Sequence, residues 1–165
     1  RFTTSRETVL AWCGQQAGMT AQEVDQIYRD WVTEHGQPEA YPFPHVRSIL
    51  ERFQAAGGRN FVFTHRSGSV HDYLAGADLT KYFTDVVSAG TTYARKPAPA
   101  GNLHIIETHG LDKARTLAVG DRELDVLAAK NAGIHACLFD AALPETAADY
   151  RIRDLSELDA LLGLE

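Results

Sequence analysis

The chain has 165 residues, of which 44% are hydrophobic and 23% charged, as is typical of one globular domain with at most a small insertion. Its formal net charge of −6 argues against nucleic acid as a partner. No apolar run reaches membrane-spanning length and no signal peptide is visible, so we expect a cytoplasmic protein without a membrane partner. Cys13 and Cys137 lie in apolar patterns without metal-ligand spacing, and both are predicted to be buried core thiols.

The first forty residues predict two helices. The first ends at Gly18, and Thr20 and Glu23 then form a capping box that starts the second. The second helix carries an amphipathic stripe made of Val24, Ile27, Tyr28, Trp31 and Val32. Trp12 and Trp31 lie on helical stripes, so we expect them to be core or packing residues rather than substrate contacts.

A proline-rich stretch, with Pro38, Pro42 and Pro44, predicts a linker after these helices. A third helix follows over residues 46–53, and short apolar runs then alternate with helical patterns. Strands are predicted at 61–63, 86–88, 117–119, 136–139 and 150–152, and helices near 70–74, 101–109, 122–132 and 158–162. Such alternation is typical of a parallel sheet covered on both faces. We therefore expect a helical part, residues 1–43, and an α/β part, residues 44–165.

Polar side chains follow three of the predicted strands. Thr64 ends the strand at 61–63, Lys96 lies in the loop after the second strand, and Asp121 and Asp125 follow the strand at 117–119. In open α/β sheets ligands bind beyond the carboxyl ends of the strands, so we expect these groups on one rim. Two carboxylates at a strand–helix junction suit Mg²⁺, which combines a few carboxylates with waters and a substrate phosphate.

Each of these residues has a purely structural alternative. Asp121 could cap the following helix, and Thr64 could bond the backbone of its own turn. Lys96 could be an ordinary solvated lysine, although the prolines after it stiffen the loop and favour a fixed ammonium group. His65 and Arg66 could reach a substrate anion or could be exposed loop residues. The remaining histidines show no ligand spacing.

The order of these motifs resembles the haloacid dehalogenase-like (HAD) phosphohydrolase superfamily. The matching features are a strand ending in Thr64, then Lys96 before a proline, then a strand ending in Gly120-Asp121 with Asp125 one turn later. Residues 120–133 are similar to the subgroup that contains phosphoglycolate phosphatases. The resemblance implies an α/β fold, with a Rossmann-like core around a parallel sheet and a small helical cap to which residues 1–43 would belong.

The resemblance also implies roles for the candidate residues. The Thr64 hydroxyl would bind the transferring phosphoryl group, and Lys96 would neutralise the charge of nucleophile and phosphate. Asp121 would be a direct Mg²⁺ ligand, with Asp125 ligating through water or orienting the site. The implied activity is a Mg²⁺-dependent phosphatase that hydrolyses a small phosphorylated metabolite through an aspartyl-phosphate intermediate.

One family motif is absent from the chain. This is the first motif, Asp-x-Asp-Gly-Thr, which supplies the nucleophile and the general acid and base at the end of an opening strand. In the family that strand lies in the middle of the sheet, between the strands that end at Thr64 and Asp121. Its absence would leave two half-sheets with unpaired backbone edges. We therefore expect the nucleophile, its strand and the first cap helix to lie upstream of Arg1.

Several other functions fit the same residues. A phosphometabolite-binding protein that has lost its nucleophile would keep the cradle and bind without turnover. A HAD phosphomutase would differ mainly in the cap and in the missing strand. A dehalogenase needs no metal and fits the Gly120-Asp121 motif poorly, and a receiver-like signalling domain would place its carboxylates early in the chain. The particular metabolite and the oligomeric state stay open.

Overall fold

The computed structural model describes residues 6–36, 41–66, 68–88, 93–139 and 145–164. The chain divides into two compact units, Arg1–Ala40 and Tyr41–Glu165, which are considered separately below. Pro38 of the predicted linker lies outside the described residues. None of the helices in these ranges is both long and apolar enough to cross a lipid bilayer.

The first unit is a pair of helices, α1 (Arg6–Ala17) and α2 (Ala21–His35), as predicted. Gly18 follows α1 with a φ of +66°, a conformation that favours glycine and ends the helix. The capping box at the start of α2 is present: Glu23 N donates to Thr20 Oγ1 over 3.2 Å, and Thr20 N donates to Glu23 Oε2 over 2.7 Å. The turn between the helices is thus fixed by local bonds.

Trp12 and Trp31 are not core residues, because they are 57% and 45% exposed. The ring of Trp31 instead stacks on His35, with 5.0 Å between the centroids. Cys13 is only half-buried, so its prediction as a core thiol is wrong. The physical reason is the same for all three residues: two helices enclose few side chains, and α2 contributes no buried residue.

The second unit alternates helices and strands as predicted. Its elements are α3 (Val46–Ala55), β1 (Asn60–Phe63), α4 (Ser69–Gly76), β2 (Phe83–Val87), α5 (Ala100–His109), β3 (Leu117–Gly120), α6 (Glu123–Ala132), β4 (His135–Phe139), β5 (Tyr150–Ile152) and α7 (Leu158–Leu162). Short 3₁₀ turns, η1 (Thr80–Tyr82), η2 (Lys113–Arg115) and η3 (Leu155–Glu157), complete the unit. The predicted strand at 86–88 begins earlier, at Phe83.

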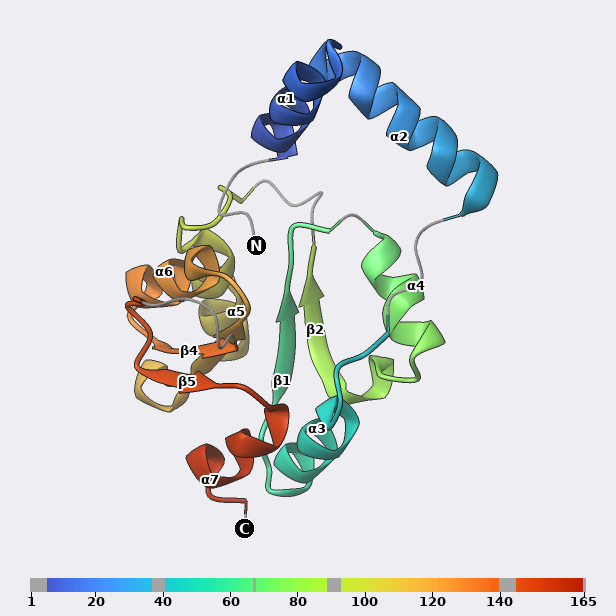
Figure 1. Cartoon of the computed structure of the whole chain (residues 1–165). Coiled ribbons are helices and arrows are strands. Elements are labelled where there is room, and N and C mark those ends of the chain that lie inside the picture. Colours follow the sequence, from blue (N-terminus) through green and yellow to red (C-terminus); the bar gives the residue numbers. More distant parts are fainter. Residues whose placement is uncertain (1–5, 37–40, 67, 89–92, 140–144, 165) are drawn as a thin grey trace. The chain divides into compact units, whose positions relative to one another are not determined.

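All strand pairs are parallel, which confirms the α/β class, but the strands form two sheets rather than one. β1 pairs with β2, and β4 lies between β3 and β5 (Figure 1). Val62 faces Val86 in the first sheet, and Val119 faces Cys137 in the second. β1 and β3 each have one edge without a strand neighbour in the described part of the chain. Two half-sheets are what the resemblance described above implies for a chain without the opening strand.

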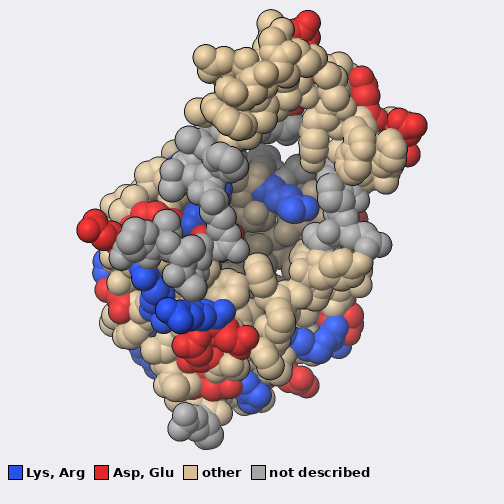
Figure 2. Space-filling model, in the orientation of Figure 1, with Lys and Arg blue, Asp and Glu red and all other residues tan. Residues whose placement is uncertain are grey.

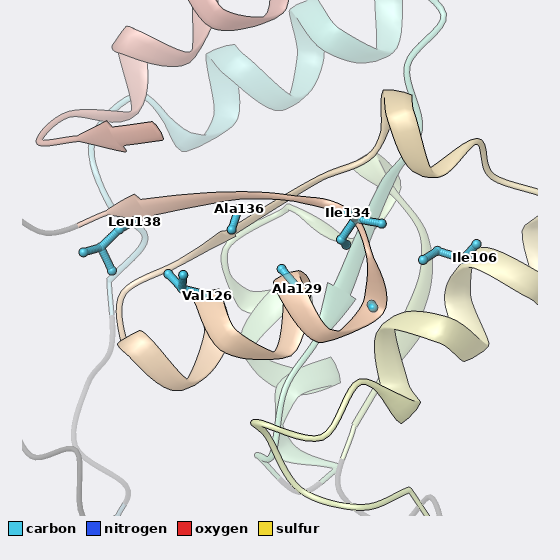
Figure 3. Close-up of a cluster of buried hydrophobic side chains, with 7 residues drawn as sticks. Ile106, Val126, Ala129, Ile134, Ala136 and Leu138 are labelled. Carbon is cyan, nitrogen blue, oxygen red and sulfur yellow. The ribbon is translucent and has the colours of Figure 1, made fainter. Parts of the chain in front are cut away.

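The main core lies between α6 and the face of the β3–β4–β5 sheet. Its buried members are Ile106, Val126, Ala129, Ala132, Ile134, Ala136 and Leu138 (Figure 3). The alanines of α6 allow the helix to approach the sheet closely. Cys137 points to the other face of β4, where it packs with Ile49 and Ile152, so its prediction as a core thiol is confirmed. Burial raises the pKa of the Cys137 thiol to about 11.

The helix α3 contacts both half-sheets. Ile49 belongs to the cluster around Cys137, whereas Leu50 packs against the cluster of Val70 and Leu74 beside the β1–β2 sheet. Val46 packs against both clusters. One apolar helix face thereby joins the two sheets.

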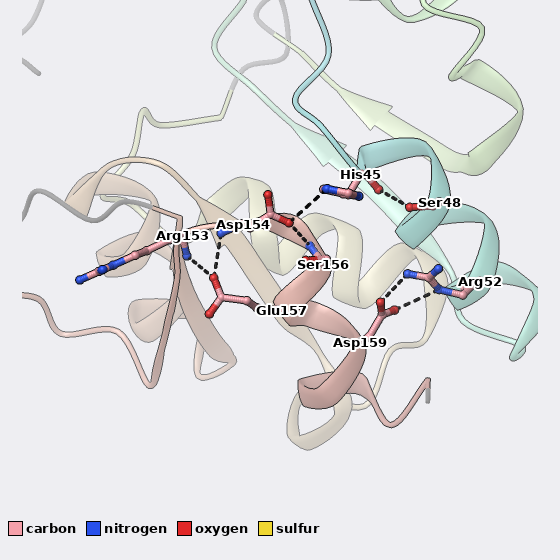
Figure 4. A network of polar contacts seen from close by, with 8 residues as sticks. All are labelled: His45, Ser48, Arg52, Arg153, Asp154, Ser156, Glu157 and Asp159. Atoms are coloured by element: carbon pink, nitrogen blue, oxygen red, sulfur yellow. Dashed lines mark hydrogen bonds and ion pairs between the residues drawn. The ribbon is translucent and has the colours of Figure 1, made fainter.

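Polar contacts fasten α3 to the C-terminal turns. Arg52 donates two hydrogen bonds to Asp159 on α7, and His45 Nε2 lies 3.7 Å from Asp154 Oδ1 (Figure 4). Asp154 caps η3, and the backbone hydrogen bonds that Glu157 accepts hold the pKa of its carboxyl below the usual value. Elsewhere on the surface, acidic and basic side chains lie next to one another, as the lower part of Figure 2 shows.

Leu138→Ala tests the main core. Leu138 is 0% exposed, so truncation leaves a cavity between β4 and α6 and should lower the free energy of unfolding by about 2–5 kcal/mol. Urea denaturation measures this change. Leu161→Ala on α7 is the matched control, because Leu161 is 40% exposed. Equal losses for the two variants would contradict the assigned core.

Candidate active site

The candidate site begins at the carboxyl end of β1. Thr64 N donates to Val87 O over 2.9 Å and so extends the parallel ladder by one bond. Thr64 Oγ1 accepts the N–H of Arg66 over 3.1 Å, as the turn alternative expects. A hydroxyl has one proton and two lone pairs, so this bond leaves the Thr64 O–H as a donor.

Lys96 is a fixed lysine rather than a solvated one. Its side chain is 11% exposed, and its Nζ donates to Phe63 O over 2.9 Å and to Asp125 Oδ1 over 2.7 Å. The ammonium group also lies 4.3 Å from the centroid of the Phe63 ring. Lys96 therefore links the end of β1 to the first turn of α6.

The carbonyl of Phe63 faces the open edge of β1. It belongs to the same planar peptide unit as the Thr64 N–H, which points toward β2, and the two groups of one unit point in opposite directions. Among the described contacts, Lys96 Nζ takes the position at this carbonyl that a neighbouring strand would otherwise fill.

Asp125 lies in the first turn of α6, and its side chain is 12% exposed. Besides the bond to Lys96, its Oδ2 lies 3.6 Å from Arg122 Nε. The backbone of Gly120, the last residue of β3, lies next to the Asp125 side chain. A Cβ at Gly120 would overlap the Asp125 side chain, so glycine at the end of β3 is what allows the approach.

Asp121 lies between β3 and α6 and is half-buried. It does not cap α6: the N-cap residue is Arg122, which has no side-chain cap bond, so the capping alternative is wrong. No hydrogen bond or ion pair of Asp121 occurs in the part of the chain that the structure describes. Within those ranges, no other group competes with a ligand for its carboxylate.

His65 and Arg66 differ in their placement. His65 is half-buried, and its Nε2 accepts the backbone N–H of Lys96 over 3.3 Å. Burial lowers the pKa of His65, and the positive charges of Lys96 and Arg95 lower it further. Arg66 is exposed and lies over the ring of Tyr73 on α4, 5.9 Å from its centroid, so the described contacts do not bring it to Lys96.

Two residues that sequence reasoning missed support this site. Asn131 on α6 donates to Pro97 O over 2.9 Å and holds the loop that carries Lys96. Gly101 on α5 gives room to the Phe63 ring, which a Cβ there would overlap. Of the two, only Gly101 left a trace in the sequence, as a glycine within a predicted helix.

The donor set fits Mg²⁺. Asp121 and Asp125 offer carboxylate oxygens, one of which is already bonded to Lys96. The described residues contain no cluster of three or more His, Cys, Asp or Glu with metal-binding geometry. Mg²⁺ commonly uses one or two protein carboxylates and completes its shell with water and substrate phosphate, so two suffice.

The parallel α/β core thus carries Thr64, Lys96, Asp121 and Asp125 in segments that follow the carboxyl ends of its strands. The family model of haloacid dehalogenase-like hydrolases matches residues 3–139, and the chain belongs to this family. Among curated proteins it is 31% identical to a phosphoglycolate phosphatase of Vibrio parahaemolyticus over 66% of this chain and 48% of that protein. It is 32% identical to a phosphoglycolate phosphatase of Aliivibrio fischeri over 68% of this chain and 48% of that protein. The chain spans about half the length of these relatives.

Solved structures give the same assignment. A HAD-superfamily hydrolase of subfamily IA from Geobacter sulfurreducens matches with a TM-score of 0.66 and 32% identity, over 73% of this chain and 60% of that one. A predicted phosphoglycolate phosphatase from Haemophilus somnus matches with a TM-score of 0.81 over 94% of this chain and 75% of that one. At 20% identity this match supports the fold alone. The expected membership of the HAD superfamily and its phosphoglycolate phosphatase-like subgroup is confirmed.

Gly120→Ala tests the close approach of β3 to Asp125. The added Cβ must displace the Asp125 side chain, and such overpacking should lower the free energy of unfolding by about 1–3 kcal/mol. Gly76→Ala at the end of α4 is the control, since a Cβ at Gly76 meets nothing within 4 Å. Thermal unfolding of both variants decides the point, and a Gly120→Ala protein as stable as the control contradicts the contact.

Proposed function

We propose that this chain forms the phosphate and Mg²⁺ cradle of a phosphatase that hydrolyses a small phosphorylated metabolite. The observation that carries the proposal is the fixed ammonium group of Lys96, held between Phe63 O and Asp125 Oδ1 at the sheet edge. A buried lysine in this setting is preorganised to meet an anion without reorganising. The phosphoglycolate phosphatases among the relatives support a phosphomonoester as substrate.

The protons of the cradle suit a phosphoryl group. An ammonium group has three protons, and two of them are used by Phe63 O and Asp125, so the third is available to a phosphate oxygen. The free O–H of Thr64 is a second donor on the same strand end. Phosphoryl transfer depends mainly on stabilising negative charge on the equatorial oxygens, which these two groups would supply.

Asp121 and Asp125 are the proposed Mg²⁺ ligands, Asp121 directly and Asp125 through water or as an orienting group. When bound, the metal would neutralise part of the negative charge that phosphate and carboxylates bring together. The lack of a hydrogen bond or ion pair of Asp121 among the described residues supports this assignment.

The attacking group is proposed to be an aspartate outside these 165 residues, which contain no Asp-x-Asp-Gly-Thr motif. A strand carrying that aspartate would fit beside β1 and β3, each of which has an edge without a strand neighbour among the described residues. Lys96 Nζ would keep its bond to Phe63 O at the end of β1. Hydrolysis would then proceed through an aspartyl phosphate. We also propose that residues 1–43 belong to a cap, and that the whole protein is cytoplasmic.

A second candidate is a phosphometabolite-binding protein without turnover, which the absence of the nucleophile motif favours. A phosphomutase would share the cradle as well. The binding protein predicts Mg²⁺-assisted binding of phosphate with no release of product, so turnover separates it from the two enzymes.

Asp121→Ala should abolish most Mg²⁺-dependent hydrolysis of p-nitrophenyl phosphate by the full-length protein. Losing a metal ligand removes several kcal/mol of charge stabilisation, so we expect turnover to fall about 100-fold or more. Asp72→Ala is the matched control, because Asp72 is an exposed aspartate on α4. Unchanged turnover in Asp121→Ala would refute the metal assignment. A wild-type protein that binds Mg²⁺ and inorganic phosphate in calorimetry without turnover would favour the binding protein.

A further inference from the structure

The histidine after Thr64 bonds to the backbone of the fixed lysine. Lys96 N donates to His65 Nε2, while Lys96 Nζ returns to Phe63 O on the same strand end. The two ends of Lys96 are thus bonded to residues two positions apart at the carboxyl end of β1. Such a double attachment restricts the backbone and the side chain of the lysine together.

The bond also defines the protonation of the ring. Because a backbone N–H can only donate, His65 Nε2 must accept, and the neutral ring carries its proton on Nδ1. The environment favours this neutral form: burial lowers the pKa of His65, the charges of Lys96, Arg95 and Arg122 add to this effect, and only Asp125 opposes it.

The position of the His65 ring is itself fixed by packing. The rings of Phe63 and His65 pack edge to face, with their centroids 5.6 Å apart and their planes at 90°. Phe63 is held in turn against Gly101 of α5, where an added Cβ would come within 2.4 Å of the Phe63 ring. His65 therefore presents Nε2 to the Lys96 loop from a supported position.

The same loop is held from the other half-sheet. Asn131 Nδ2 on α6 donates to Pro97 O, and Asp125 on α6 accepts from Lys96 Nζ. His65 supplies the bond to the loop backbone from the β1–β2 side. The short segment 96–97 is thereby fixed to both sheets, which share no strand pairing in the described residues.

We propose that His65 is a positioning residue for Lys96, with Nε2 fixing the lysine backbone so that the ammonium group reaches Phe63 O and Asp125 together. This role differs from a contact with the substrate anion, because Nε2 is already used by the Lys96 N–H. The benefit for phosphate binding rests on the proposed function, whereas the attachment of the loop does not.

Two substitutions by amide side chains of different length distinguish a positioning role of His65 from a substrate contact. The Gln carbonyl oxygen extends to about the position of Nε2, whereas the Asn amide extends only to that of Nδ1. If His65 positions Lys96, His65→Gln should keep the Lys96 amide protected from hydrogen exchange, and His65→Asn and His65→Ala should lose that protection. Inorganic phosphate with MgCl₂, titrated by calorimetry, should bind about three- to tenfold more weakly to the last two variants and within about twofold of wild type to His65→Gln.

The ring of the unmodified protein gives a spectroscopic signature. Long-range ¹H–¹⁵N correlation should show His65 as the neutral Nδ1–H tautomer. Full affinity in His65→Asn with loss in His65→Gln would overturn the proposal in favour of a substrate contact at Nδ1. Unchanged Lys96 exchange in all three variants would overturn it as well. Thermal unfolding identifies any variant whose fold is lost.

A failure of the proposed function would give a different experimental result. If Lys96→Ala binds inorganic phosphate as tightly as wild type, Lys96 is not an anion-binding group and the cradle assignment fails. Lys96 amide exchange in the histidine variants still decides whether His65 holds the loop.

Discussion

The structure of the site depends on one buried ion pair, between Lys96 and Asp125. Removing two charges from water costs several kcal/mol, and their attraction repays that cost only when the remaining donors and acceptors are also satisfied. Here Phe63 O provides the second acceptor for Lys96, and the loop backbone is bonded from both sides by His65 and Asn131. A pair of this kind contributes less to stability than to a single defined arrangement, and that arrangement brings the end of β1 to the start of α6.

The same pair links the two half-sheets near the carboxyl ends of their strands. α3 joins them through apolar contacts, with Ile49 on one cluster and Leu50 on the other. Lys96 joins them through polar contacts at the carboxyl ends of the strands. Apolar packing tolerates small shifts in position, whereas hydrogen bonds fix distances and angles closely, so the polar link is the one suited to set the geometry of the proposed phosphate cradle.

The sequence allowed accurate prediction where the controlling interactions are local. The capping box of Thr20 and Glu23 and the glycine after α1 involve neighbours within four residues, and both helix boundaries were correct. Lys96 and Asp125 could be predicted to lie on the same rim because each follows a strand of a parallel sheet. The exposure of Trp12 and Cys13 was missed because burial depends on which other elements pack against a helix. The bonds of His65 and Asn131 were missed because they depend on the path of a loop, which no periodic pattern encodes.

The charges around the cradle also indicate why phosphate and a divalent cation belong together in the proposed function. Lys96 and Arg122 are positive and Asp125 and Asp121 are negative, while the His65 ring, whose Nε2 accepts a hydrogen bond, is neutral. The charges of these five side chains therefore sum to zero. A phosphate dianion and an aspartate nucleophile would add a net charge of about −3 to this low-dielectric edge. Lys96 has only one proton left to offer, since Phe63 O and Asp125 use the others. The proposed metal at Asp121 would offset two of those charges, so each ligand should raise the affinity for the other by the same factor.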